Sequence, residues 1–281
     1  MLKVKQALDL PSAAGIADHA ATILATGVSS MKILITGAGG FLGRGLVIPF
    51  EEHNHTLRLM DVVPFTSRHE VVVGSVENYA QVEAAMRGMD ALVIGHMAPR
   101  GEKNINYQTP KMPFDINVTG TANLFHAAKA CGVKRIVLIS STSVANISTK
   151  PSEQPLRGTE YYSLSKVLQE VIAEQFARVE KMQIACLRVG YILDGEANVD
   201  KYGKKIGEIN YADTDRRDIG EVARLCLECP DLGFEMFNVM STQESLERAA
   251  VKYTCERLKW KPRYDFSWLA PEGSTKKKAT T

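Results

Sequence analysis

A tyrosine and a lysine four residues apart could carry acid–base chemistry in this chain. They stand in the segment Tyr162-Ser-Leu-Ser-Lys166, which is compatible with a helix, where residues at i and i+4 share one face. A free tyrosine has a pKa of about 10 and is a poor base at neutral pH, but a neighbouring ammonium favours the phenolate. We therefore expect Tyr162 to take a proton from a substrate hydroxyl with the help of Lys166.

A second pair has the same spacing, in Tyr107-Gln-Thr-Pro-Lys111. Pro110 breaks an interior helical turn, so these two side chains need not share a face. The Tyr162 pair also follows a strand pattern that ends in hydroxyl residues, Ile139-Ser-Ser-Thr-Ser-Val144. We therefore prefer Tyr162, although a Tyr/Lys pair of this spacing can also be an ordinary surface pair.

A glycine-rich loop follows the first apolar run and reads Thr36-Gly-Ala-Gly-Gly-Phe-Leu-Gly43. Glycine allows a tight turn and lets the backbone approach a pyrophosphate, while the next helix directs its N-terminal N–H groups at the anion. A loop of this kind between a strand and a helix predicts dinucleotide binding. The expected contacts come from Gly37, Gly40, Phe41, Leu42 and Gly43.

An acidic residue, Asp61, ends the second strand pattern, at about the distance from the loop where a ribose-binding carboxylate is expected. A carboxylate accepts hydrogen bonds from both ribose hydroxyls of the adenosine and repels a 2′-phosphate. We therefore expect NAD rather than NADP as the cofactor. Arg58 and Arg68 lie nearby in the sequence and could soften this preference.

Apolar strands alternate with helical segments from residue 31 onward. This order predicts an α/β fold, a Rossmann doubly wound parallel sheet with helices on both faces. The expected strands are Lys32–Thr36, Thr56–Asp61, Glu70–Gly74, Ala91–Gly95, Arg135–Ser140 and Ile184–Val189. The expected helices follow the glycine loop to about Phe50 and then cover Asn78–Met86, Pro113–Cys131 and Glu160–Val179.

Composition excludes several classes of protein. Hydrophobic residues make up 45% and charged residues 23%, as in ordinary globular proteins, and the net charge is +2. We expect no nucleic-acid or membrane partner, because the charge is balanced and no apolar run is long enough to span a bilayer. The five cysteines are scattered, so they predict no disulfide framework. Cys226 and Cys229 form an isolated pair and predict no metal site. Free cysteines of this kind favour a cytoplasmic protein.

The organisation of the chain is expected to be simple. Residues 1–30 form an extension of unknown role, with a short helix near 13–25. Residues 31–270 form a single NAD-binding Rossmann domain, with a small substrate lobe from about residue 190 onward. Residues 271–281 contain a lysine triplet and are expected to be a flexible basic tail.

The motifs together resemble the extended short-chain dehydrogenase/reductase family. The loop at 36–43 resembles its TGxxGxxG motif, and Tyr162 and Lys166 resemble its catalytic pair. Ser141 matches its catalytic hydroxyl, which orients the reacting oxygen and stabilises developing charge. Further similar segments are Asn117–Thr121, Leu187–Gly190, Arg217–Ala223 and Leu258–Pro262.

The resemblance implies further site residues. Ser75, Val76 and His96 take the positions of cofactor contacts, although Ser75 replaces a frequent aspartate and His96-Met-Ala-Pro99 departs from the usual HLAA. Tyr162 and Lys166 are implied to contact the cofactor as well, with Lys166 on the nicotinamide ribose. Ser141, Thr142, Ser143 and Tyr162 are the implied substrate contacts. The family also implies a homodimer, because its helices often pair between subunits.

The short stretch between Gly190 and Asp218 favours a small-molecule substrate. In layout the chain resembles uronate dehydrogenases, which oxidise the anomeric carbon of a sugar acid with NAD. Those enzymes bind the carboxylate with an arginine of the lobe, where this chain offers Lys201, Lys204 and Lys205. Two alternatives remain: a nucleotide-sugar epimerase that uses the same Tyr/Lys pair, and a non-catalytic protein that senses NAD(P).

Overall fold

The computed structural model describes residues 30–267. The chain divides into two compact units, Met1–Ser30 and Met31–Thr281, and the description below concerns the second. The helix expected near 13–25 and the tail expected at 271–281 lie outside the described residues.

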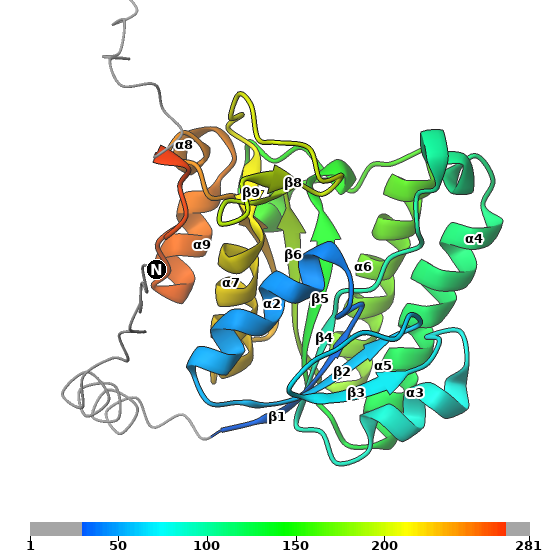
Figure 1. The fold of residues 1–281 in the computed structure, drawn as a ribbon. Helices are drawn as coiled ribbons and strands as arrows, with labels where there is room; N and C mark the ends of the chain where they lie inside the picture. The colour runs from blue at the N-terminus through cyan, green and yellow to red at the C-terminus, as the bar shows by residue number, and fades with distance from the viewer. Residues whose placement is uncertain (1–29, 268–281) are drawn as a thin grey trace, which may run out of the picture. The chain divides into compact units, whose positions relative to one another are not determined.

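A sheet of seven parallel strands forms the centre of the second unit (Figure 1). Its order is β10-β6-β5-β4-β1-β2-β3, so the strand sequence reverses between β1 and β4. The strands are β1 (Lys32–Thr36), β2 (Thr56–Asp61), β3 (Glu70–Val73), β4 (Ala91–Ile94), β5 (Arg135–Ser141), β6 (Gln183–Val189) and β10 (Phe234–Val239). This is the doubly wound Rossmann arrangement, so the expected fold class is confirmed.

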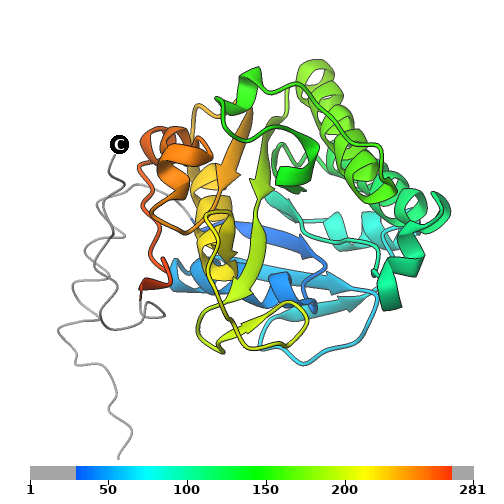
Figure 2. The ribbon, with the colours of Figure 1, turned by 90° about the horizontal axis from the view of Figure 1, so that it is seen from above.

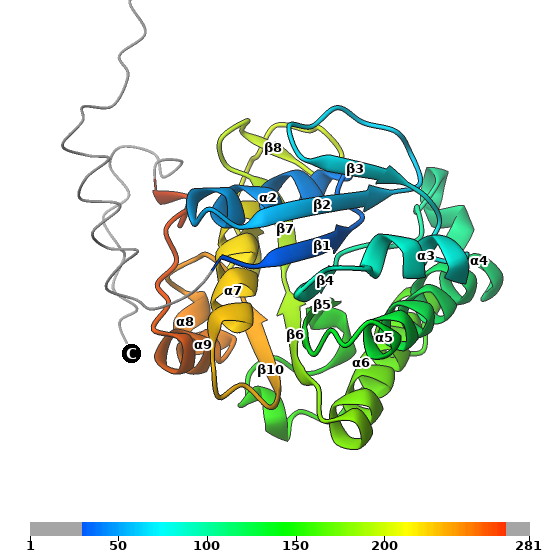
Figure 3. The same cartoon turned by 90° about the horizontal axis from the view of Figure 1, so that it is seen from below.

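Helices cover both faces of this sheet, as Figure 3 shows: α2 and α7 pack on one face, and α3, α5 and α6 on the other. In Figure 2, α6 (green) and α7 (yellow) lie on opposite sides of the strands. The helices are α2 (Phe41–Glu52), α3 (Tyr79–Met86), α4 (Lys111–Pro113), α5 (Gly120–Ala130), α6 (Tyr161–Glu180), α7 (Arg216–Glu228), α8 (Ser245–Arg248) and α9 (Val251–Leu258). Among the described residues, none of these helices is long and apolar enough to cross a bilayer.

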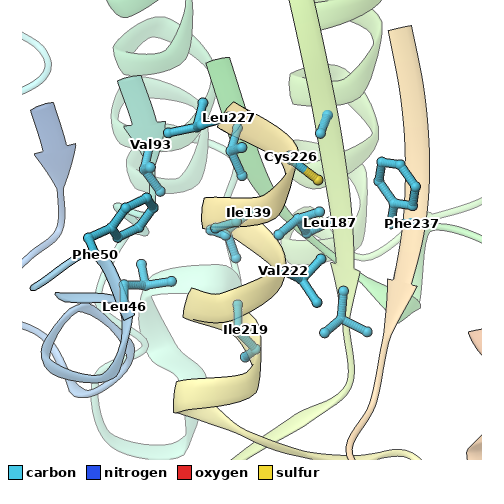
Figure 4. Packing of buried hydrophobic residues seen from close by; sticks show 14 of the residues in the cluster. Leu46, Phe50, Val93, Ile139, Leu187, Ile219, Val222, Cys226, Leu227 and Phe237 are labelled. Atoms are coloured by element: carbon cyan, nitrogen blue, oxygen red, sulfur yellow. The ribbon is translucent and has the colours of Figure 1, made fainter. Parts of the chain in front are cut away.

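The packing of α7 accounts for the burial of Cys226, one member of the pair Cys226 and Cys229. Ile219, Val222 and Cys226 point from α7 toward Ile139 and Leu187 of the sheet (Figure 4). Full burial of an Ile, Leu or Val side chain contributes roughly 1.5–3 kcal/mol to the free energy of folding. Cys226 is therefore a core residue, and the described residues contain no cluster of His, Cys, Asp or Glu that could hold a metal ion.

The helix expected over 113–131 begins earlier and is not uniform. It starts as α4 at Lys111, widens into a π-helical segment over Phe114–Thr119 and continues as α5 to Ala130. The π-helical segment contains buried Asn117, whose side chain accepts from the Ala98 N–H and donates to the Ser165 hydroxyl. Widened helical turns are frequent at functional sites, and this one ties α6 to the loop after β4.

Residues after Gly190 contribute to two sheets. Strands β7 (Tyr191–Asp194), β8 (Val199–Asp200) and β9 (Asp213–Asp215) form a small separate sheet in the region expected to be the lobe. The chain then returns through α7, and β10 pairs in parallel with β6 at the edge of the main sheet. The expected helices and strands did not include α7 or β10, although the similar segment Arg217–Ala223 lies within α7.

A buried ion pair joins α6 to the sheet. Both carboxylate oxygens of Glu170 accept from the guanidinium of Arg188, at 3.0 and 2.8 Å, and one also accepts from the Ser140 hydroxyl at 2.6 Å. The Nη1 of Arg188 donates to the Pro151 carbonyl and to the Gln154 side-chain oxygen. These bonds link α6, β5, β6 and the 151–154 turn. Because Glu170 and Arg188 neutralise each other, no buried charge is left uncompensated.

Replacement of Glu170 by alanine should destabilise the protein by about 3–5 kcal/mol, because it leaves the buried Arg188 charge unpaired. Chemical denaturation measures this change. The matched control is Glu180→Ala, which removes an exposed pair with Lys129 and should cost at most about 1 kcal/mol. Equal losses in the two variants would contradict the structural role given to Glu170.

Candidate active site

The glycine-rich loop brings backbone atoms too close together for side chains at two positions. Gly37 has φ +69°, in the left-handed region, and a Cβ there would lie 2.7 Å from the Cα of His96. A Cβ on Gly43 would lie 2.4 Å from the Gly37 carbonyl oxygen. Helix α2 starts at Phe41, and Gly40 before it supplies no capping side chain. The N–H groups in the first turn of α2 are therefore available to an anion.

Asp61 lies beside this loop at the end of β2. Its Oδ2 accepts from the Gly39 N–H at 2.9 Å and its Oδ1 from the Val63 N–H at 3.2 Å. The two arginines that could favour NADP are engaged elsewhere, because Arg58 pairs with Glu70 and Arg68 with Glu51. The local charge therefore favours a ribose with free hydroxyls over one with a 2′-phosphate.

A cavity of about 530 Å³ opens along this edge of the sheet. The residues expected at the cofactor that line it are Gly37, Gly40, Phe41, Leu42, Gly43, Asp61, Ser75, Val76 and His96. Lining residues that sequence reasoning missed include Val62, Val63, Arg100, Ile192 and Tyr202, whereas Lys201, one of the three lysines offered for a carboxylate, also lines the cavity. The cavity lies at the carboxyl ends of β1, β2 and β4, where the strand order reverses and ligands bind in sheets of this kind.

His96 is held as a neutral wall of this cavity. Its Nε2 donates to the Ile116 carbonyl at 3.1 Å, which leaves Nδ1 to accept from the Thr36 hydroxyl at 3.1 Å. Burial, followed by the nearby Lys166 ammonium, lowers the pKa of His96 to about 3. The ring therefore carries no charge at neutral pH and orients the loop after β4.

Three consecutive residues at the end of β5 form the other part of the site. The buried Lys166 Nζ donates to the Ile139 carbonyl at 2.8 Å, and Glu170, one turn further along α6, accepts from Ser140. Ser141 is the next residue, and its hydroxyl oxygen accepts from the N–H and the hydroxyl of Ser143. Burial lowers the pKa of Lys166 to about 8, so the ammonium is mostly protonated at neutral pH.

Tyr162 stands in the first turn of α6, beside the cavity rather than among its lining residues. Arg100 connects Tyr162 to the cavity. It lines the cavity, and its guanidinium carbon lies 4.5 Å from the centre of the Tyr162 ring. Ser141, Thr142, Ser143 and Lys166 also lie outside the cavity lining. The signal for Arg100 was its place in the loop that follows a buried strand, β4, at the edge where parallel strands end.

The second Tyr/Lys pair does not form a unit. The Tyr107 hydroxyl donates to the Ala98 carbonyl at 2.8 Å, and burial raises the pKa of Tyr107 to about 12. Lys111 pairs instead with Asp115 on the surface. A raised pKa leaves less phenolate at neutral pH, so Tyr107 is less available as a base and this geometry favours Tyr162 for proton transfer.

The parallel sheet, the glycine loop after its first strand and the tyrosine–lysine helix together define a protein with the short-chain dehydrogenase/reductase fold. Residues 33–193 match the NAD dependent epimerase/dehydratase family, and the chain belongs to that family. NAD is the cofactor of this family. The cradle at Gly37 and Gly43 and the carboxylate of Asp61 fit this cofactor.

Curated relatives match parts of the chain. A 3-beta-hydroxysteroid dehydrogenase of Mycolicibacterium neoaurum is 34% identical over 121 residues, 40% of this chain and 32% of that protein. A uronate dehydrogenase of Pseudomonas syringae pv. tomato is 28% identical over 171 residues, 57% of this chain and 58% of that protein. The chain therefore spans less than two thirds of either relative.

Solved structures share the fold over more of the chain. A variant of uronate dehydrogenase from Agrobacterium tumefaciens, complexed with NAD, superposes with a TM-score of 0.65 at 22% identity. The match covers 84% of this chain and 85% of that one. Most of the described architecture is therefore that of this fold.

Replacement of Gly43 by alanine should weaken NAD binding by roughly tenfold or more, because the new methyl group meets loop backbone that must then move. Calorimetric titration with NAD measures the affinity. Gly233→Ala is the matched control, since a Cβ there meets nothing within 4 Å, and it should bind NAD as the parent does. Unchanged affinity in Gly43→Ala would show that the loop does not approach the cofactor.

Replacement of Asp61 by alanine should lower the preference for NAD over NADP by about tenfold or more, because it removes the ribose acceptor and the charge that repels a 2′-phosphate. The ratio of the two dissociation constants measures the preference. Asp90→Ala is a control, because Asp90 accepts from the Lys32 N–H at the opposite end of β1. The idea fails if both variants keep the parental ratio.

Proposed function

We propose that this protein oxidises a hydroxyl group of a small sugar or sugar acid, with NAD as the hydride acceptor. The observation that carries the proposal is the position of Tyr162 against Arg100, a residue of the same cavity that the glycine loop lines. This position brings a candidate base to the edge of the candidate cofactor site. Such a base can remove the hydroxyl proton while hydride leaves the carbon.

The residues of the chain divide the work. Tyr162 takes the proton of the substrate hydroxyl, and the Ser141 hydroxyl holds the reacting oxygen and stabilises its developing charge. Lys166 donates one of its three N–H bonds to the Ile139 carbonyl, which leaves two for the nicotinamide ribose. Its positive charge would favour the phenolate of Tyr162. NAD, when bound, supplies the hydride acceptor. The N-terminus of α2 would hold the phosphates of this cofactor, and Asp61 would hold its adenosine ribose.

The size of the substrate follows from the small sheet. Between Gly190 and the start of α7 at Arg216 the chain forms β7, β8, β9 and the segments that join them, so little polypeptide is available to enclose a nucleotide. The likeness to a uronate dehydrogenase supports the same substrate class. A monosaccharide or its acid therefore fits this proposal better than a nucleotide sugar.

Nucleotide-sugar epimerisation is the second candidate, and the family match is the observation that favours it, because the family includes epimerases. An epimerase returns the hydride to its substrate and releases no NADH. A dehydrogenase accumulates NADH with one substrate. Absorbance at 340 nm with NAD and a panel of aldoses and uronic acids separates the two.

Replacement of Tyr162 by phenylalanine should reduce kcat by roughly a hundredfold or more and leave NAD binding intact, because only the phenolic proton acceptor is lost. NADH formation and NAD titration measure the two quantities. The matched control is Tyr161→Phe, which removes the hydroxyl of the preceding residue in the same helix. Equal turnover in the parent and Tyr162→Phe would remove Tyr162 from the mechanism.

A further inference from the structure

Two cations line the cavity from distant parts of the chain. Arg100 follows β4, and Lys201 follows β8 in the small sheet. Within residues 30–267, neither side chain has a carboxylate within ion-pair distance. Unpaired positive charges inside a cavity attract an anionic ligand, because the surrounding protein screens them less than water does.

The main chain before Arg100 is fixed on both sides. The Ala98 N–H donates to Asn117, and the Ala98 carbonyl accepts from the Tyr107 hydroxyl at 2.8 Å. Asn106 donates to the Pro99 carbonyl at 2.9 Å. The guanidinium is thereby delivered to the face of the Tyr162 ring, at the end of the site where the substrate hydroxyl must react.

The donors of Arg100 are poorly used. Its Nε is buried without a hydrogen-bond partner among the described residues, and one Nη makes only a long contact of 3.4 Å with Asn104. A buried donor without a partner is costly, and an acceptor supplied by a ligand removes that cost. The planar fork of arginine matches the two oxygens of a carboxylate.

Lys201 completes the arrangement. Its ammonium lies 4.4 Å from the centre of the Tyr191 ring, and neighbouring Asp200 is already bonded to the Tyr191 hydroxyl and to the N–H groups of Tyr202 and Lys204. Burial, followed by the charge of Arg100, lowers the pKa of Lys201. The two cations therefore repel each other, and an anion between them would relieve that repulsion.

We propose that Arg100 and Lys201 bind the carboxylate of an anionic substrate, and that Arg100 places this substrate against Tyr162. The proposal rests on the proposed function and narrows the substrate class to sugar acids. Of the three lobe lysines, only Lys201 lines this cavity; Lys205 lines a separate one beside Asp200 and Asp213. The phosphates of the cofactor are a different source of negative charge, and they are expected at the glycine loop.

The kinetic test compares D-galacturonate with D-galactose, which differ in the carboxylate. We expect the parent protein to prefer the acid, and Arg100→Gln and Lys201→Met to reduce the acid-to-neutral ratio of kcat/KM, Arg100→Gln by about thirtyfold or more, mainly through KM for the acid. Lys204→Met is the matched control and should keep the parental ratio. A preference for the neutral sugar, or equal losses on both sugars in Arg100→Gln, would overturn the proposal.

A binding test keeps the proposal separate from the catalytic one. In Tyr162→Phe protein loaded with NAD, calorimetry should detect D-galacturonate, and adding Arg100→Gln should weaken this binding by about tenfold or more. If binding depends on Arg100 while Tyr162→Phe still turns over, the assigned base is wrong and the carboxylate site stands. If no galacturonate binds, or if Arg100→Gln weakens NAD binding instead, the carboxylate site is wrong.

Discussion

The buried pair of Glu170 and Arg188 is the constraint on which the positions of Tyr162, Lys166 and Ser141 depend. It closes a network in which α6, β5, β6 and the 151–154 turn meet at one point. Tyr162 and Lys166 lie earlier on the same helix, and Ser141 directly follows Ser140 on the same strand. A shift of either element would move Tyr162, the proposed base, relative to the Ser141 hydroxyl. The position of the pair explains why so costly a burial of charge fits this fold.

The sheet divides the remaining work at the point where its strand order reverses. On one side, β1, α2 and β2 form the cofactor cradle, where Gly37 and Gly43 let backbone segments approach closely. On the other side, β5, α6 and β6 carry the candidate chemistry. Strand β4 lies between these halves, and the loop that follows it contains His96 and Arg100. This loop contacts both halves, because the backbone of His96 lies against Gly37 and the guanidinium of Arg100 lies over the Tyr162 ring.

Much of the fold was predictable, because its signals are local. The bounds expected for β1 and β2 agree with the structure, since β1 is a short apolar run and β2 carries the apolar residues Leu57, Leu59 and Met60 between turn segments. Strand β10 was missed because Glu235 and Asn238 interrupt the apolar residues of Phe234–Val239, and it becomes a strand by pairing with β6. The widened turn around Asn117 was also missed, because it depends on contacts with Ala98 and Ser165 from distant segments.

The same distinction separates the two parts of the candidate site. The sequence alone determined the glycine loop, Asp61 and the Tyr162–Lys166 pair, because each consists of residues whose spacing along one strand, turn or helix already sets their geometry. Only the tertiary structure decided that Lys201, and neither Lys204 nor Lys205, lines the cavity. It also decided that Arg100 lies over Tyr162. Those positions depend on how loops from separate strands meet at the sheet edge, which no local spacing encodes.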